Sequence, residues 1–538
     1  KLYFEYNSGA GGKLLRMTNR LGGRIDISWS QDQLSTITDY ATSRNLAFTY
    51  DQWGRLTDVT DPESKVVSFT YDGSNMLTTR TDQESKLIGY VYDLSGRLTS
   101  LTNENNQSYT FEYDTNGKIT NVKDAYSAVQ KSYVIGDAVT QISDPNIQTS
   151  ECTFDSSGYI SKIQTGTLIT EYQRNSMKEV TQITDPKSHL ITLVYDSNGN
   201  ITSTNIEGIT QSFTFNSSNQ LTLYTDAKNK NTSFEYTNNK LTKITNPLSQ
   251  EVTFGYVNNK LASVTSPYGQ GTATWGIAYD SNNYPNSVQS PSGKTWNYTN
   301  SATGKVSSYE DPNGNDWTYT YDNRGRLKTA TDPLNNPWNF YYDNSGNLTE
   351  AKDPLNHSIY YTYDNNSRLV KVKNALNHEV EINRRSDGRI NWVEDPMNKR
   401  TSYTYDTLGR VTTVTNPESE ATTVAYDNNS NITSVTNPMN KTTSLQYDTH
   451  DRLTQVTNPL NKITSFQYDN NGNLTKITNA LQKETNFTYD DLNRLTQMTN
   501  ALSQSWTRIY DNAGKLVQVD GPSTTAQEFS YNSDGLMA

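Results

Sequence analysis

The chain has 538 residues, a formal net charge of −11 at pH 7 and only 33% hydrophobic residues. One hydrophobic core does not grow to this length, and a conventional globular protein of this size carries more apolar residues. The charge is spread thinly and no long basic run occurs, which argues against a nucleic-acid partner. Neither a signal sequence nor a span of ~20 apolar residues is present, so we expect no membrane span.

Along the chain, an aromatic residue recurs at a nearly constant spacing. In residues 1–113 the equivalent positions are Tyr6, Trp29, Tyr50, Tyr71, Tyr92 and Tyr113. Between residues 114 and 320 the register loosens, through Tyr133, Phe154, Tyr172, Tyr195, Phe215, Tyr236, Tyr256, Tyr279 and Tyr298. From Tyr321 to Tyr531 the step is 21 residues, and Arg384 takes the aromatic position once.

A fixed period in the twenties indicates one supersecondary unit copied many times, here about 26. We therefore predict a single continuous repeat array over residues 1–538, regular in 1–113, irregular in 114–320 and strictly regular in 321–538. The last residues, YNSDGLMA, begin another repeat, and we expect the chain to be a segment of a longer polypeptide.

One repeat predicts two strands and two turns. Phe466–Tyr468 alternates apolar and polar residues, as a half-buried strand does. Asp469–Gly472 is a turn signal, because Asp bonds to backbone N–H groups two or three residues on and Gly supplies a positive φ. A second strand, Leu474–Thr478, follows. The return turn of the preceding unit is Asn458–Leu460, where Pro has no ladder hydrogen bond to lose.

We predict an all-β fold of antiparallel hairpins. A parallel β-helix would stack equivalent carboxylates such as Asp448 and Asp469 at ~4.8 Å, whereas hairpins separate them by ~10 Å, which like charges prefer. Leu474 and Ile477 lie three residues apart, which predicts a β-bulge. About 52 strands make a ribbon roughly 250 Å wide, and because strands twist, such a ribbon must coil and enclose space.

The repeats resemble a known family. Fifteen YD dipeptides, in segments such as YDTLGRVTTVTNPESE and YDNRGRLKTATDPLNN, are similar to the Rhs or YD repeats. These occur in bacterial Rhs proteins, wall-associated proteins of Gram-positive bacteria, shell subunits of insecticidal toxin complexes and teneurins. The resemblance implies a sheet that spirals into a hollow shell, which encloses a toxic domain in the toxin members. After Tyr531 the chain carries neither the self-cleaving core nor the toxin domain of that pattern, so cargo release and self-proteolysis are assigned to no residue.

Several residues that could carry chemistry have simpler structural interpretations. The Tyr–Asp pairs could bind sugars, but turn formation explains the Asp without a ligand. Calcium would suit the Asp and Asn columns, but one ion is not easily shared across ~10 Å. His357 and His378 fall at a solvated turn position, and Cys152, the only cysteine, is interpreted as a small core residue that forms no internal disulfide. We predict no catalytic residue, no metal site and no cofactor.

The least regular region, residues 266–296, is the one candidate binding patch. Its aromatic residues outside the repeat position are Tyr268, Trp275, Tyr284 and Trp296. A bend or drifted repeats explain the region, and a contact surface for a partner or a glycan is the sharper interpretation.

Two functions follow as hypotheses. The first is a non-enzymatic shell or scaffold segment of a secreted or cell-surface bacterial protein, Gram-positive by expectation, that encloses a polypeptide or toxin domain of its parent protein. The alternative is an adhesin that binds carbohydrate or cell wall through its Tyr-rich surface. For either function we expect a monomer.

Overall fold

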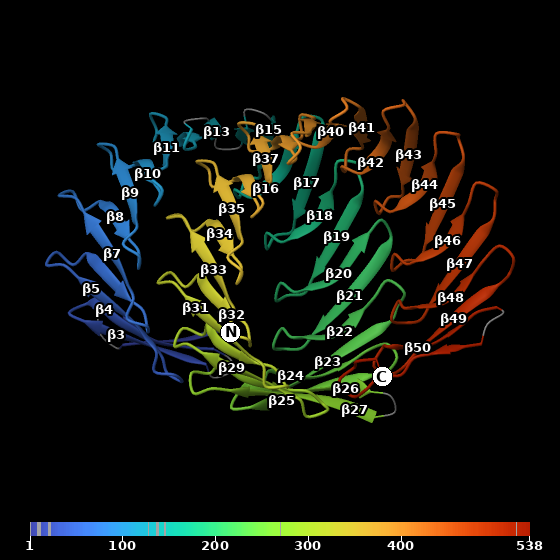
Figure 1. Cartoon of the computed structure of the whole chain (residues 1–538), viewed down its shortest axis with the longest axis horizontal. Coiled ribbons are helices and arrows are strands. Elements are labelled where there is room, and N and C mark those ends of the chain that lie inside the picture. The colour runs from blue at the N-terminus through green and yellow to red at the C-terminus, as the bar shows by residue number, and fades with distance from the viewer. Residues whose placement is uncertain are drawn as a thin grey trace. The chain divides into compact units, whose positions relative to one another are not determined.

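The computed structural model describes residues 2–7, 12–19, 23–126, 129–135, 139–144, 147–268, 271–522 and 525–537. Within these ranges every regular element is a β-strand (Figure 1). No helix in the described part of the chain is long and apolar enough to cross a membrane.

The strands alternate with short turns along the whole chain. The first thirteen are β1 (Leu2–Tyr6), β2 (Leu14–Asn19), β3 (Arg24–Ser30), β4 (Gln33–Asp39), β5 (Asn45–Tyr50), β6 (Leu56–Thr60), β7 (Val66–Tyr71), β8 (Leu77–Thr81), β9 (Leu87–Tyr92), β10 (Leu98–Thr102), β11 (Ser108–Tyr113), β12 (Ile119–Lys123) and β13 (Val129–Ile135). The next thirteen are β14 (Val139–Asp144), β15 (Ile147–Phe154), β16 (Ile160–Thr165), β17 (Leu168–Arg174), β18 (Val180–Thr184), β19 (Leu190–Tyr195), β20 (Ile201–Ile206), β21 (Ile209–Phe215), β22 (Leu221–Thr225), β23 (Asn231–Thr237), β24 (Lys240–Thr245), β25 (Glu251–Val257) and β26 (Lys260–Tyr268).

The later strands are shorter and more uniform. They begin with β27 (Gly271–Tyr279), β28 (Pro285–Gln289), β29 (Thr295–Asn300), β30 (Val306–Glu310), β31 (Asp316–Tyr321), β32 (Leu327–Thr331), β33 (Pro337–Tyr342), β34 (Leu348–Lys352), β35 (Ser358–Tyr363), β36 (Leu369–Lys373), β37 (Glu379–Arg384) and β38 (Ile390–Glu394). They end with β39 (Arg400–Tyr405), β40 (Val411–Thr415), β41 (Ala421–Tyr426), β42 (Ile432–Thr436), β43 (Thr442–Tyr447), β44 (Leu453–Thr457), β45 (Ile463–Tyr468), β46 (Leu474–Thr478), β47 (Glu484–Tyr489), β48 (Leu495–Thr499), β49 (Ser505–Tyr510), β50 (Leu516–Asp520) and β51 (Gln527–Glu528).

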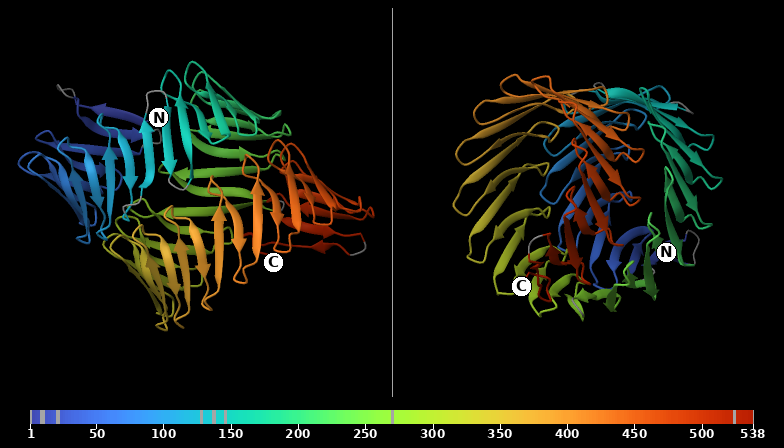
Figure 2. Two further views of the ribbon diagram at one scale, coloured as in Figure 1. Left: turned by 90° about the horizontal axis from the view of Figure 1, so that it is seen from above. Right: turned by 90° about the vertical axis from the view of Figure 1, so that its right-hand side faces the viewer.

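Consecutive strands pair antiparallel in one sheet, from β1 with β2 to β50 with β51. Figure 2 shows the resulting hairpins from two further sides. The antiparallel prediction is confirmed, and the parallel β-helix is excluded because its strands would pair in the same direction.

Contacts between Cα atoms divide the chain into two compact units, each described by itself below. Unit 1 comprises Lys1–Tyr133, Tyr256–Ala262 and Trp275–Arg400, and unit 2 comprises Val134–Gly255, Ser263–Thr274 and Thr401–Ala538.

The turn that follows each repeat tyrosine, called here the YD turn, has five positions, as in Asp469–Asn473. Oδ1 of Asp469 accepts hydrogen bonds from the backbone N–H groups of Asn471 (3.0 Å) and Asn473 (2.8 Å). The second bond reaches the fourth residue on, not the third, because the N–H of Gly472 donates to the carbonyl oxygen of Asp469. Gly472 has φ +87°, as the sequence predicted.

The return turn has the same construction, which the sequence analysis did not recognise. Oδ1 of Asn458 accepts from the N–H groups of Leu460 (2.9 Å) and Lys462 (3.0 Å). Asn461 occupies the fourth position with φ +58°, a conformation that Asn tolerates better than most side chains. Most of the described five-residue turns therefore have an Asp or Asn at position one and a left-handed residue at position four. Ser290, Ser301 and Arg385 take position one in three others.

The predicted bulge is confirmed. Gln467 pairs with Lys476 and Tyr468 pairs with Leu474, so Thr475 is the extra residue on its strand. This shift explains the three-residue spacing of Leu474 and Ile477, and it recurs in the other regular hairpins.

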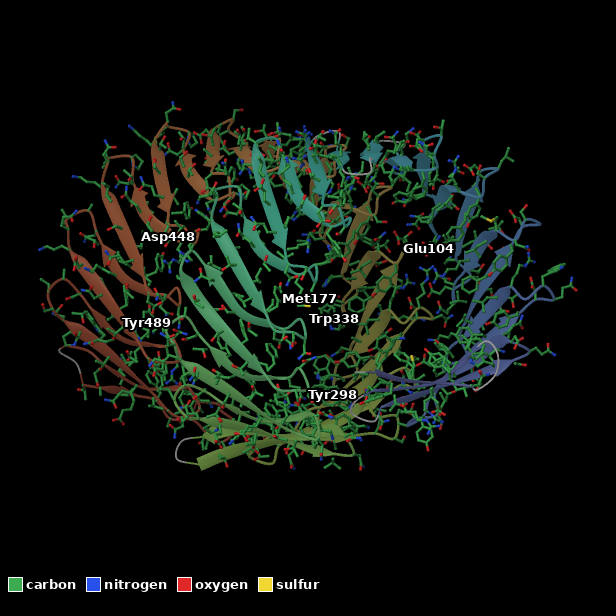
Figure 3. All side chains as sticks on the ribbon, turned by 180° about the vertical axis from the view of Figure 1, so that it is seen from behind. Glu104, Met177, Tyr298, Trp338, Asp448 and Tyr489 are labelled. Atoms are coloured by element: carbon green, nitrogen blue, oxygen red, sulfur yellow. The ribbon has the colours of Figure 1, made fainter. Side chains whose placement is uncertain are left out.

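The sheet has no thick core. Among the described residues, the buried apolar ones are Ile27 (9% exposed) and Ala273 (6%), and no large side chain is fully buried. Figure 3 shows side chains standing on the ribbon throughout, Tyr489 among them. A single layer of half-buried strands accounts for the low hydrophobic content.

Candidate functional site

The repeat tyrosine ties neighbouring hairpins together. The hydroxyl of Tyr468 donates to the carbonyl oxygen of Leu453, 15 residues earlier, at 2.9 Å. The same bond is made by Tyr71, Tyr113, Tyr195, Tyr321, Tyr342, Tyr363, Tyr426, Tyr447, Tyr489, Tyr510 and Tyr531. The polar atoms of the Tyr–Asp pair are thus engaged within the sheet, which favours the structural interpretation of the motif.

In several repeats an arginine at position five of the YD turn links one repeat to the next. Nε of Arg452 donates to Oδ2 of Asp448 (2.7 Å), and its Nη1 donates to the carbonyl oxygen of Asp469 (2.8 Å). The guanidinium also lies 5.1 Å from the ring centroid of Tyr468. Burial acts to raise the pKa of Asp448, but the hydrogen bonds from Arg452 outweigh it and lower that pKa.

Arg384, the one non-aromatic residue in the tyrosine position, reproduces the tyrosine bond. Its Nε and Nη2 both donate to the carbonyl oxygen of Leu369 at 3.2 Å, again 15 residues earlier. With Tyr126, Arg368 and Arg385 it lines a pocket of about 350 Å³ in unit 1. Arginine at the tyrosine position therefore keeps the hydrogen bond to the carbonyl oxygen 15 residues earlier and adds a positive charge to this pocket.

In unit 1, turns from two distant segments meet. Arg324, at position three of a YD turn, forms an ion pair with Asp82, at position one of a return turn. Two residues on, Nη2 of Arg326 lies 2.7 Å from Oε2 of Glu84. The Asp82 residue is only 7% exposed, so this pair is largely removed from water.

The same contact recurs in neighbouring repeats of unit 1. Nδ2 of Asn366 donates to Oδ2 of Asp124, a residue only 4% exposed, at 2.6 Å. The hydroxyl of Thr303 donates to Oε1 of Glu63 at 2.6 Å. That bond, helped by Lys65, lowers the pKa of Glu63 to about 2 against the opposing effect of burial.

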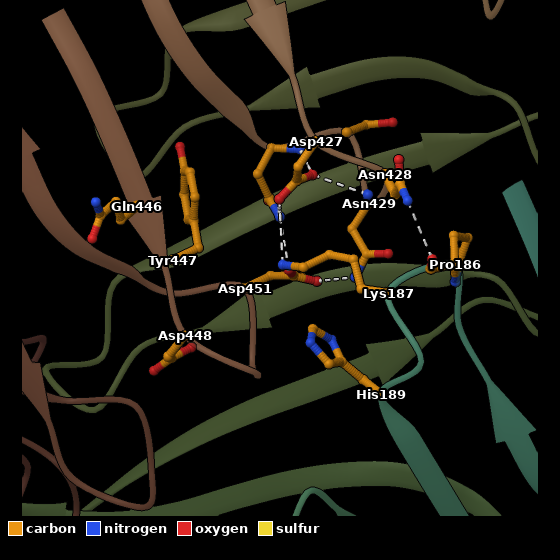
Figure 4. A network of polar contacts seen from close by, with 12 residues as sticks. Pro186, Lys187, His189, Asp427, Asn428, Asn429, Gln446, Tyr447, Asp448 and Asp451 are labelled. Atoms are coloured by element: carbon orange, nitrogen blue, oxygen red, sulfur yellow. Dashed lines mark hydrogen bonds and ion pairs between the residues drawn. The ribbon is translucent and has the colours of Figure 1, made fainter. Parts of the chain in front are cut away.

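Unit 2 contains an equivalent contact (Figure 4). Nδ2 of Asn429 donates to Oδ2 of Asp185 at 2.7 Å. Nζ of Lys187 lies 2.9 Å from Oδ1 of Asp451 and 3.3 Å from Oδ2 of Asp427. Burial acts to raise the pKa of both aspartates, but hydrogen bonds from Lys187 and the nearby asparagines lower it.

Farther along unit 2 the pattern continues. Nδ2 of Asn471 donates to Oδ2 of Asp226 at 2.6 Å. Nζ of Lys228 lies 3.4 Å from Oδ2 of Asp469, and Nζ of Lys230 lies 2.9 Å from Oδ1 of Asp491.

We call each of these rows of contacts a seam. At both seams the return turns of the earlier segment meet the YD turns of the later one. The partners of Arg326, Asn366, Asn429 and Asn471 lie 242 to 245 residues earlier in the chain. That separation is about eleven and a half repeats of 21 residues. The half repeat arises because YD turns and return turns lie at opposite ends of the strands, so the two sheet edges that meet are of different kinds.

One cluster in the unit 2 seam has the composition of a metal site. Ligand atoms of Asp185, His189 and Asp451 lie within 4.8 Å of one another. However, Oδ1 of Asp185 already accepts the N–H groups of Lys187 and His189, and its Oδ2 accepts Asn429. The ammonium group of Lys187 also lies against Asp451. The carboxylates of the cluster therefore have hydrogen-bond and ion-pair partners within the protein, and we assign the cluster no metal.

The expected aromatic patch is divided. Trp275 and Trp296, both in unit 1, stack with ring centroids 5.9 Å apart. Tyr284, also in unit 1, lies under the guanidinium of Arg44 at 4.5 Å. Tyr268 belongs to unit 2, where its hydroxyl donates to the carbonyl oxygen of Tyr531. All four residues are half-buried.

The other residues weighed from the sequence lie at exposed or intermediate positions. His357 and His378 are exposed at position five of their return turns, as expected. Cys152 is half-buried on β15. The seam residues were not predicted from the sequence. The signal that could have indicated them is an Asp at position one of the earlier return turns together with an Asn or Arg at position three of the later YD turns.

Sequence comparison identifies related families. The model of the Teneurin YD-shell matches residues 164–340 and 366–459, which is half of the chain. The RHS repeat model matches residues 50–84, 92–129, 447–484, 468–505 and 489–526. Among curated proteins no sequence matches the chain.

Solved structures share the fold. The TcdB2-TccC3 crystal structure matches with a TM-score of 0.54 at 13% identity, over 98% of this chain and 39% of that one. The TcdB2-TccC3-Cdc42 structure gives 0.52 at 11% identity, over 100% and 38%. The Tc holotoxin pore of Photorhabdus luminescens gives 0.52 at 12% identity, over 98% and 36%. The chain thus spans less than two fifths of the length of these solved chains.

Proposed function

We propose a structural function for this chain, which belongs to the Teneurin YD-shell family: it forms part of the wall of a shell that encloses a polypeptide. In this proposal the chain is a non-enzymatic segment of a secreted or cell-surface bacterial protein, Gram-positive as the repeats suggest. The enclosed polypeptide would be a toxin domain or another part of the parent protein.

The seams are the observation that carries the proposal. A single-layer sheet leaves gaps wherever one pass of the ribbon runs beside the next, unless their edges join. In each unit the edges join through repeated contacts between turns, including the nearly buried Asp82 and Asp124. Where the edges are joined, neighbouring passes of the sheet form a continuous wall. A container needs such a wall, whereas an open array of repeats does not.

Small-angle X-ray scattering of the purified chain tests the proposal. The ribbon laid flat would span roughly 250 Å, so a wall that curves back on itself predicts a maximum dimension under about 100 Å with a hollow-particle profile. A long, rod-like profile would overturn the proposal.

The adhesin remains the second candidate, favoured by the aromatic residues at positions 275–296 of unit 1. Its test is binding to purified peptidoglycan and wall polysaccharide. Trp275→Ala and Tyr284→Ala should abolish binding, and Trp53→Ala, an exposed tryptophan outside the patch, should not. The stacking of Trp275 on Trp296 weakens this candidate, because one ring face is already covered.

A further inference from the structure

One repeat of unit 1 departs from the repeat signature at both of its defining positions. Arg384 and Arg385 stand where the repeats on either side have Tyr363–Asp364 and Tyr405–Asp406. The turn still forms, because the N–H of Gly388 donates to the carbonyl oxygen of Arg385 at 2.9 Å. The change therefore alters the chemistry of this repeat and leaves its backbone as it is in the others.

The altered repeat lies at a pocket within unit 1. The pocket, of about 350 Å³, is lined by Arg384 and Arg385, by Tyr126 of the earlier segment and by the apolar side chains of Val370 and Ile382. Turns of both segments border it, so it belongs to the interior of the seam and not to an uncovered edge of the sheet. Pockets of this size hold small molecules.

The guanidinium group of Arg384 has N–H groups to spare. Its Nε and Nη2 donate to the carbonyl oxygen of Leu369, and its Nη1 donates to that of Gly388 at 3.0 Å. These bonds use three of the five N–H groups of a guanidinium. Within the described part of the chain no carboxylate forms an ion pair with Arg384, so its charge is not balanced by a neighbouring acid.

A second guanidinium group borders the same pocket. In regular repeats an arginine at position five lies over the tyrosine ring 16 residues on, as Arg410 does over Tyr426 at 4.6 Å. Arg368 holds position five before Arg384, so a guanidinium group replaces the aromatic ring and the cation–π contact is lost. Asp364 balances the charge of Arg368 at 2.7 Å, which leaves the charge of Arg384 for another partner.

The acids around the pocket do not fill that role. Asp124 accepts a hydrogen bond on each carboxylate oxygen, one from a backbone N–H and one from the seam amide at 2.6 Å. Asp364 likewise accepts on both oxygens. Glu381, three residues before Arg384 on β37, points to the opposite face of the sheet, because side chains alternate along a strand.

The earlier segment adds a further donor. The hydroxyl oxygen of Tyr126 accepts the backbone N–H of Asn365 at 3.1 Å, so its own O–H can donate to a ligand. Tyr126 is 52% exposed, which keeps this hydroxyl within reach of solutes. The groups that a ligand would meet are thus mainly N–H and O–H donors beside a positive charge.

From this arrangement we propose that the pocket binds an oxyanion, namely a carboxylate or phosphate group carried on a small molecule. The remaining N–H groups of Arg384 and the O–H of Tyr126 donate to its oxygens, since the planar guanidinium matches both kinds of anion. Val370 and Ile382 contact the uncharged part of the ligand. This binding is separate from the proposed role of the chain as a wall and does not depend on it.

Isothermal titration calorimetry at low salt tests the proposal, with sodium phosphate, sodium glucuronate and glucose as probes. At least one of the two anions should bind with a dissociation constant of about 1 mM or lower, and uncharged glucose should not bind. Tighter binding of phosphate would indicate a phosphorylated ligand, and tighter binding of glucuronate a carboxylate. A chain that binds neither anion would overturn the proposal.

Restoring the regular repeat gives the most informative variant. Arg384→Tyr combined with Arg385→Asp introduces the residues that fold in neighbouring repeats, so the chain should fold and its affinity for the anion should fall at least about tenfold. Tyr126→Phe removes one hydroxyl from a partly exposed side chain and should weaken binding several-fold with little change in stability. Unchanged affinity in both variants would exclude this pocket as the site.

A charge-matched control separates the pocket from general attraction of anions. Lys441→Glu combined with Lys462→Gln removes two cations and adds one acid, as the repeat-restoring variant does. These two lysines are exposed and lie in unit 2, away from the residues that line the pocket, so affinity should be unchanged. Equal losses in the control and in the repeat-restoring variant would mean that overall charge attracts the anion, and would also overturn the proposal.

Discussion

The seams of unit 1 and unit 2 join the same two kinds of turn, but their charges are reversed. In unit 1 the cations, Arg324 and Arg326, lie on YD turns and face Asp82 and Glu84 on return turns. In unit 2 the cations lie on return turns, as Lys187 does, and face acids on YD turns. Where both partners of a seam contact are charged, they are of opposite sign, and either kind of turn can carry the cation.

The reversal has a use. An edge of unit 1 placed against the wrong edge of unit 2 would bring like charges together, and like-charge contacts at an interface cost several kcal/mol. Hydrogen bonds from Asn to Asp occur in both seams. Because the amide is uncharged, these bonds do not depend on which edge carries the cations. The ion pairs therefore favour edges of opposite charge, and the Asn–Asp contacts add hydrogen bonds without that preference.

Reversing the charge of Arg324 should cause the largest loss. Arg324→Glu places a carboxylate against the nearly buried Asp82, and breaking such a pair costs about 3–5 kcal/mol. Hydrogen exchange should rise in peptides that cover residues 80–87 and 320–328, while unit 2 stays protected. Combining it with Asp82→Asn, which removes the facing carboxylate and keeps an oxygen to accept the turn N–H groups, should restore part of the protection. A double variant no better than the single would contradict the charge-pair account.

Lys187→Glu is the corresponding break in unit 2 and should cost less, about 1–2 kcal/mol, because the lysine is more solvated than Arg324. The measurement is urea unfolding followed by exchange in residues 183–190 and 425–453. Lys462→Glu, an exposed lysine without an ion pair, is the matched control and should change stability by under about 0.5 kcal/mol. Equal losses for the two variants would mean that the seam contributes nothing here.

Acidification should produce the smallest and most gradual change. Hydrogen bonding lowers the pKa of Glu63 to about 2, so its contribution is complete above about pH 4.5 and is lost as the pH falls towards 2. The difference in thermal midpoint between the unmodified chain and Glu63→Gln should therefore be constant above pH 5 and shrink below it. A difference that does not change with pH would contradict the assigned role of Thr303.

Local structure was predictable from the sequence because its determinants are local. The bulge could be inferred from the spacing of Leu474 and Ile477, and the YD turn from Asp469 and Gly472. The return turn was only partly recognised, because Asn461 adopts the left-handed conformation without being glycine.

The seams were beyond sequence reasoning. Arg324 and Asp82 are 242 residues apart, and the separation depends on how tightly the sheet curves, which no single repeat encodes. Position three of the YD turn also varies, from Arg324 to Asn366 to Asn429, so no fixed motif marks it. The aromatic patch stays a prediction. Two of its residues, Tyr268 and Trp275, are close in sequence but belong to different units.

The half-repeat offset at the seams has an evolutionary consequence. Repeat proteins commonly gain and lose whole units, and a change of one 21-residue unit between seam partners would move every later YD turn one step past its return turn. Each charged contact would then meet a residue selected for a different neighbour. The number of repeats between the two segments should therefore be held constant by selection, even while the residues on the open faces of the same repeats diverge.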